Sequence, residues 1–99
     1  TNHNHDDFES FSVAIEPLGE AAHLEARVRM VMAEAGVLRI KGFAEVAGRP
    51  MRLVIQAAGL RVERYFDRPW GEGEARPSRL VVIGLKGMDR AGVERALRG

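Results

Sequence analysis

The stretch that decides the fold is residues 36–66, GVLRIKGFAEVAGRPMRLVIQAAGLRVERYF. Apolar residues recur at every second position, which is the period of a strand with one face on a core. Charged or polar residues fill most of the positions between them. We therefore predict three consecutive strands in an antiparallel meander, apolar on one side and basic on the other. The residues expected to face the core are Leu38, Ile40, Ala44, Val46, Met51, Leu53, Ile55, Ala57, Leu60, Val62 and Phe66.

Turn residues separate the three strands. The sequence AGRP at residues 47–50 carries turn chemistry, and Ala58-Gly59 breaks the second apolar run. Before the meander, residues 8–15 (FESFSVAI) alternate as a strand does. After it come a loop at 67–79 and an apolar run at 80–85 (LVVIGL), which is typical of a strand covered on both faces.

Two helices complete the expected set of elements. Residues 20–35 carry one helical stripe of apolar side chains, with Gly36 placed as a left-handed C-cap. Asp89 is a suitable N-cap for a short last helix. We expect an α+β fold in the order strand–helix–four strands–helix. It would be a mostly antiparallel sheet of four to five strands with both helices packed on one face.

Composition describes an ordinary globular domain. The chain has 99 residues, 45% hydrophobic and 29% charged, with a net charge of +1 and no cysteine. No apolar run approaches the ~20 residues of a membrane helix, and no secretory signal is visible. The absence of cysteine fits a cytoplasmic protein. The first residue is Thr1 and not Met, so we expect a processed product or a piece of a longer protein.

Histidine and aspartate gather at the N-terminus. We expect residues 1–7, TNHNHDD, to be the flexible end of a linker and residues 8–99 to form a single domain. The linker end contains the only metal-like cluster, which suits Zn²⁺ or Co²⁺. A solvated arm that binds nothing specific and a cloning tag are the alternatives. The candidate ligands are His3, His5, Asp6 and Asp7.

The basic side of the meander is the candidate binding surface. Strand alternation places Arg39 and Lys41 on the side opposite the core, and Arg52 and Arg61 join them from neighbouring strands if the register is right. Like charges gathered on one sheet face repel, so an acidic partner surface would explain the arrangement. Trp70, on the following loop, is either a binding anchor or a ring folded back over a hydrophobic edge.

Catalytic signatures are missing from these 99 residues. There is no G-x-x-x-x-G-K-[ST] loop for nucleotide phosphates, no G-x-G-x-x-G, no H-E-x-x-H pair and no G-x-S-x-G. The basic face resembles a nucleic-acid platform in outline, but the RNP-type aromatic motif is absent and the net charge is low. We therefore predict no enzymatic activity and no cofactor bound to this fragment, and the sequence disfavours a nucleic-acid partner.

Four pieces of sequence, in order, suggest a family. They are residues 37–43 (VLRIKGF), a short hairpin with an apolar strand, a loop bearing Trp70, and residues 78–84 (SRLVVIG) before a terminal helix. Together they resemble the C-terminal domain of the CobW-type GTPases, relatives of the nickel-insertion GTPases for hydrogenase and urease. The resemblance covers nearly the whole chain. Each piece is modest alone, and the specificity lies in their order and spacing.

The resemblance implies a larger parent protein. In that family an N-terminal P-loop domain hydrolyses GTP and carries a metal-binding cysteine motif, and a linker that is often rich in histidine leads to the C-terminal domain. GTP, Mg²⁺ and Co²⁺ or Zn²⁺ would then belong to the parent. The family name points to cobalt delivery for cobalamin biosynthesis, and related members handle zinc.

The expected function is therefore that of a non-catalytic C-terminal domain in a GTP-dependent metallochaperone. Its expected partners are the GTPase domain of the same chain, a metalloprotein client or a second copy of itself. The alternative is a free-standing domain that binds nucleic acid or a small ligand.

Overall fold

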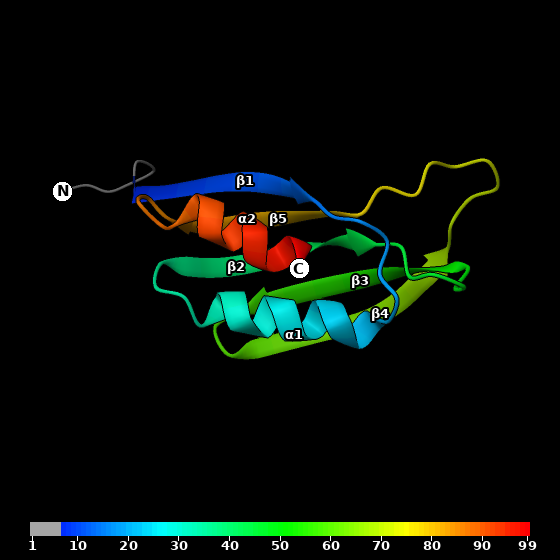
Figure 1. Ribbon diagram of the computed structural model, residues 1–99, viewed down its shortest axis with the longest axis horizontal. Helices are drawn as coiled ribbons and strands as arrows, with labels where there is room; N and C mark the ends of the chain where they lie inside the picture. The colour runs from blue at the N-terminus through cyan, green and yellow to red at the C-terminus, as the bar shows by residue number, and fades with distance from the viewer. Residues whose placement is uncertain (1–6) are drawn as a thin grey trace.

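The structure, a computed structural model, describes residues 7–99 and contains five strands and two helices in that range (Figure 1). The predicted α+β class and element order are confirmed. The elements are β1 (Phe8–Ala14), α1 (Ala21–Met32), β2 (Val37–Ala44), β3 (Met51–Ala58), β4 (Arg61–Pro69), β5 (Arg79–Leu85) and α2 (Arg90–Arg98).

The five strands form one sheet in the order β1-β5-β2-β3-β4, and every neighbouring pair is antiparallel. The meander β2-β3-β4 is the predicted one. The last strand, β5, is inserted between β1 and β2, so these two strands run parallel without pairing. Both helices lie against the same face of the sheet (Figure 1).

The core lies between the sheet and the two helices. The helices contribute buried side chains from α1 (Leu24, Val28) and from α2 (Val93, Leu97). Asp89 caps α2 as predicted, because its side chain accepts a hydrogen bond from the backbone N–H of Gly92. The strands contribute the other side of the core with residues that include Phe11, Val13, Ile40, Leu53, Ile55, Leu80 and Val82.

The core assignments of Leu38 and Leu60 are wrong. The β2–β5 pairing shifts register between Val37 and Arg39, so Val37 is buried and Leu38 is 39% exposed. A bulge of this kind interrupts strict alternation, because two residues of one strand face one of its neighbour. Leu60 is 95% exposed because it lies in the turn after Gly59, whose φ of 60° favours glycine.

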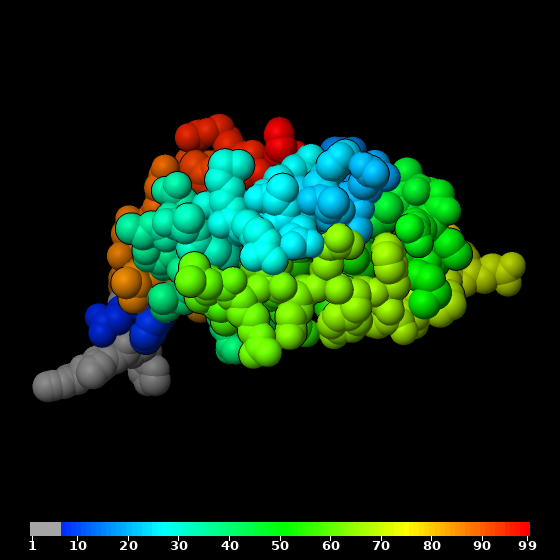
Figure 2. Space-filling model, turned by 90° about the horizontal axis from the view of Figure 1, so that it is seen from below, coloured from blue at the N-terminus to red at the C-terminus, as the bar shows by residue number. Residues whose placement is uncertain are grey.

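The first helix is shorter than the expected 20–35. It ends at Met32, and Ala35 is exposed in the turn that follows. Gly36 does adopt a left-handed φ of 90°, but it lies beyond the helix end and leads directly into β2. One side of α1 lies against β4 (Figure 2), where an ion pair joins Glu25 of the helix to Arg64 of the strand.

The two helices are short in membrane terms. Within residues 7–99, neither is long and apolar enough to cross a bilayer.

Candidate functional site

The face of the sheet that points away from both helices is called the open face here. Its residues follow from the register, because directly opposite residues of an antiparallel pair share a face. One row across the sheet contains Ser10, Ile83, Arg39, Ala58 and Arg61. The next row contains Ser12, Val81, Lys41, Gln56 and Glu63.

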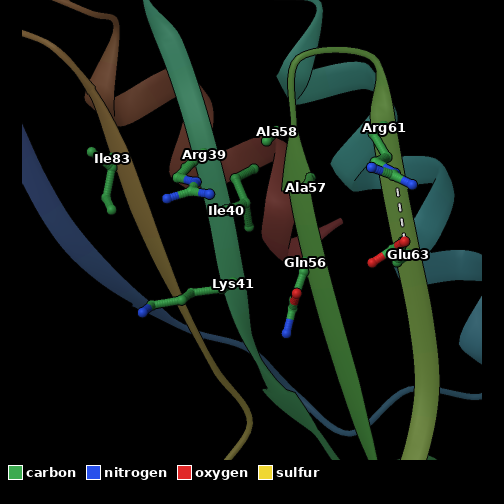
Figure 3. Close-up of a pocket in the computed structure, with 9 residues that line it drawn as sticks. All are labelled: Arg39, Ile40, Lys41, Gln56, Ala57, Ala58, Arg61, Glu63 and Ile83. Atoms are coloured by element: carbon green, nitrogen blue, oxygen red, sulfur yellow. Dashed lines mark ion pairs between the residues drawn. The ribbon is translucent and has the colours of Figure 1, made fainter.

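Three of the four predicted cations come together on the open face. Arg39, Lys41 and Arg61 line a shallow hollow of about 440 Å³ that also includes Gln56 (Figure 3). Arg61 forms an ion pair with Glu63 at 3.5 Å. Within residues 7–99, no acidic side chain lies at ion-pair distance from Arg39 or Lys41. These two cations are therefore the least compensated part of the hollow.

The fourth cation, Arg52, lies outside the hollow. Its guanidinium pairs with Asp67 on β4, with Nε donating to the carboxylate at 3.1 Å, and it stacks over the ring of Phe43 at 3.8 Å. The hydrogen bond from Arg52 lowers the pKa of Asp67, and the same bond raises the pKa of Arg52. The charge of Arg52 is thus already matched within the domain, so it offers less to a partner than Arg39 or Lys41.

Apolar side chains surround the cations on the open face. Phe43 and Tyr65 are 40% and 47% exposed, and at one end of the sheet Phe8 and Leu85 are 51% and 43% exposed. The apolar run of β5 was expected to be covered on both faces, but the helices cover only one. The outward residues Val81 and Ile83 are consequently only half-buried.

Arg79 is a fifth cation on this face that the sequence analysis did not single out. It lies opposite Phe43 in the β2–β5 register and is exposed. The sequence could have identified it, because Arg79 and Val81 are two positions apart on β5 and therefore share a face.

Trp70 is buried and not displayed. It follows the last residue of β4, its backbone N–H donates to the carbonyl of Pro50 at 3.0 Å, and its side chain is 7% exposed. The indole Nε1 has no hydrogen-bond partner in the part of the chain that the structure describes. This position agrees with a ring folded back onto the domain and leaves little surface for contact with a partner.

The predicted metal ligands are mostly outside the described residues. His3, His5 and Asp6 lie outside the described residues. Asp7 is exposed, and its backbone carbonyl accepts a hydrogen bond from the backbone N–H of Lys86 at 3.0 Å. From residue 7 onward, no group of three or more His, Asp or Glu side chains is close enough to hold a metal ion. Metal binding by the linker end stays a prediction.

Comparison with known sequences identifies relatives over almost the whole chain. Residues 8–99 match the family described as the cobalamin synthesis protein cobW C-terminal domain. A zinc chaperone CobW from Sinorhizobium sp is 53% identical over 95 residues, which is 96% of this chain and 27% of the relative. A zinc chaperone CobW from Pseudomonas aeruginosa is 48% identical over 89 residues, 90% of this chain and 23% of the relative.

Comparison with solved structures gives the same fold. The Zn(II)-bound YjiA GTPase from E. coli superposes with a TM-score of 0.75 at 25% identity, covering 91% of this chain and 28% of that one. A Zn(II)-bound triple mutant of the YjiA GTPase gives 0.76 at 26% identity, covering 94% and 30%. The chain therefore spans about a quarter of the length of the proteins it matches.

Proposed function

The chain belongs to the family of cobW C-terminal domains, and from this premise we propose that it is the non-catalytic C-terminal part of a GTP-dependent metallochaperone. Its work is to dock, through the open face, on the GTPase domain of the same protein. A metalloprotein client is the second partner class. The protein acts in the cytoplasm, and GTP and Mg²⁺ belong to the GTPase domain, because this chain has no phosphate-binding loop.

Zinc is the metal cargo that we propose. Both curated relatives are named zinc chaperones, and both solved neighbours are Zn(II)-bound. The cobalt delivery suggested by the family description is the second candidate. Neither metal is assigned a site on residues 7–99. Family membership also favours the chaperone over a free-standing domain that binds nucleic acid or a small ligand.

The observation that carries the docking proposal is the composition of the open face. Val81 and Ile83 lie on β5, an interior strand between β1 and β2, and they are only half-buried on the face opposite the two helices. Arg39 and Lys41 lie beside them without an acidic partner among the described residues. An apolar patch bordered by uncompensated cations is suited to a protein surface that carries carboxylates.

The test is charge reversal at the hollow. The double change Arg39→Glu and Lys41→Glu should weaken binding to the separately expressed GTPase domain by about tenfold or more, because two attractive pairs become repulsive. Titration calorimetry at low and high salt measures this, and binding of the parent chain should weaken as salt rises.

The matched control is the double change Lys86→Glu and Arg95→Glu. It alters the net charge equally, but it lies in the β5–α2 turn and on α2, outside the hollow. The control should bind as the parent does. Equal binding by the open-face variant and the parent, or binding that is indifferent to salt, would refute docking through the open face.

A further inference from the structure

Among residues 7–99, no strand pairs with the outer edge of β1. The N–H of Ile15 bonds to the carbonyl of Ser78, and the N–H of Lys86 bonds to the carbonyl of Asp7. In an antiparallel ladder alternate residues bond to the same neighbour, so residues 7, 9, 11, 13 and 15 bond to β5. Residues 8, 10, 12 and 14 therefore present their N–H and C=O groups on the other side, where Figure 1 shows no further element beyond β1.

One of the outward carbonyls is already used. The Nε of Arg98, from α2, donates to the carbonyl oxygen of Ala14 at 3.2 Å. This bond is independent support for the direction in which the even-numbered residues point. It leaves Phe8, Ser10 and Ser12 as the open part of the edge.

The two edges of the sheet are protected very differently. On β4, at the other edge, five of nine residues are charged, the strand ends in Pro69, and Arg64 is tied to α1 through Glu25. Charges and proline are the usual devices against edge-to-edge pairing. On β1, Glu9 is the single charged residue of seven, and there is no proline. The edge at β1 is therefore left open to another strand.

We propose that this edge pairs with the β1 strand of a second copy of the chain, antiparallel and about a two-fold axis at Ser10. Ser10 then lies opposite its own equivalent, and Phe8 lies opposite Ser12. This register uses all three open residues and leaves the bond between Arg98 and Ala14 intact. A register centred on Phe11 would instead place Phe8 opposite Ala14 and compete with Arg98.

Charge complementarity also selects this register and a second copy as the occupant. With Ser10 on the axis, Glu9 lies opposite Phe11 of the other copy, on the helix-covered side. Arg90 stacks over Phe11 at 4.6 Å within each chain. The Glu9 carboxylate accepts a hydrogen bond from the backbone N–H of Gly87 in its own chain at 3.1 Å through one oxygen. The axis brings its other oxygen toward Arg90 of the other copy, where two symmetric ion pairs can form. Like charges do not meet at the axis, because Ser10 is neutral. This inference is independent of docking through the open face.

The sharpest test uses the absence of cysteine from the chain. In Ser10→Cys, the two thiols would lie on opposite residues about 5.5 Å apart at Cα, within the range of a disulfide. In the matched control Ser12→Cys, the two residues would be separated by four positions, roughly 13 Å. Mild oxidation should convert Ser10→Cys to a covalent dimer about tenfold faster than Ser12→Cys. Equal rates for the two variants would overturn the register.

A second experiment tests the edge without a crosslink. Sedimentation of the chain should show reversible, concentration-dependent doubling of mass. Ser10→Pro removes an outward N–H and spares the bonds to β5, so it should weaken the dimer about tenfold or more. Ser10→Ala keeps that N–H and should dimerise as the parent does. Ser10→Lys, which places two ammonium groups at the axis, serves if the proline variant fails to fold.

The outcomes separate cleanly. Loss of the dimer in Ser10→Pro or Ser10→Lys with its retention in Ser10→Ala supports the pairing. A chain that stays monomeric at all concentrations, or proline and lysine variants that dimerise as the parent does, would overturn it. Docking of the GTPase domain on the open face is read from a different assay and can fail or succeed separately.

Discussion

The two faces of the sheet are built from the same five strands, but the helices bury one face and leave the other exposed to solvent. The covered face brings Ile40, Leu53 and Ile55 to 1% exposure or less against the helices. The open face keeps Phe43 and Tyr65 at 40% and 47% exposure on either side of Val54, and the next rows of the same face carry arginine and lysine. The difference teaches that alternation specifies which side of a strand is apolar, whereas coverage depends on what else the chain, or a partner, supplies.

The largest effect should come from truncating the covered face. Changing Ile55 to Ala should lower the free energy of unfolding by about 2–5 kcal/mol, because a fully buried side chain leaves a cavity. Chemical denaturation followed by the fluorescence of Trp70, the single tryptophan, measures this. The same truncation at Ile83, on the open face, should cost less than half as much. Equal costs for the two variants would mean that the faces do not differ in packing.

A smaller effect should come from the ion pair on the open face. The hydrogen bond from Arg52 lowers the pKa of Asp67 in the folded protein. The ion pair therefore stabilises the fold at pH values above the pKa of Asp67 in the unfolded chain, about 4, and this stabilisation is lost as the pH falls through the folded pKa. Asp67→Asn should therefore be less stable than the parent at pH 7. The difference should shrink as the pH falls below about 4.

Thermal unfolding across pH measures the effect at Asp67. Glu63→Gln is the control, because Glu63 is more exposed and its pair with Arg61 is longer, at 3.5 Å. Exposed pairs contribute little, so the control should be close to the parent. A difference for Asp67→Asn that persists unchanged at low pH would contradict the assignment to the ion pair.

The smallest effect on stability should come from the hollow itself. Arg39→Glu with Lys41→Glu should change the free energy of unfolding by less than about 0.5 kcal/mol, because both side chains are exposed. Denaturation of the double variant beside the parent provides the measurement. A loss above about 1 kcal/mol would show that these cations support the domain and do not merely lie on its surface.

Local pattern was enough to predict the elements and most of the core. Ile40, Leu53 and Ile55 could be assigned because every second residue faces the core from Ile40 to Ala44 and from Leu53 to Ala57. Leu38 could not, because a bulge follows from pairing with β5 and leaves no mark in the sequence of β2 itself. Leu60 was misassigned because alternation was extended into the turn between β3 and β4, where the side chain is 95% exposed.

The candidate site was predictable in its members but not in its grouping. Alternation alone placed Arg39 and Lys41 on the outward side. Separating Arg52 from them required the β3–β4 register, which shifts between Met51 and Leu53 and brings Arg52 to Asp67. Insertion of β5 between β1 and β2 is a property of the whole chain, so the open side of β5 could not be recognised from its apolar sequence.

The position of β1 has a consequence for the order of assembly. The meander β2-β3-β4 pairs neighbours in sequence through short turns, whereas β1 pairs with β5 across nearly the full chain, from Phe8 to Leu85. Closing so large a loop is entropically costly and slow, so we expect β1 to join the sheet last. A strand held on one side only, at the end of a long closure, is also the first to open by local unfolding. The chain N-terminal to Phe8 is thus attached to a strand that we expect to join the sheet last and to open early.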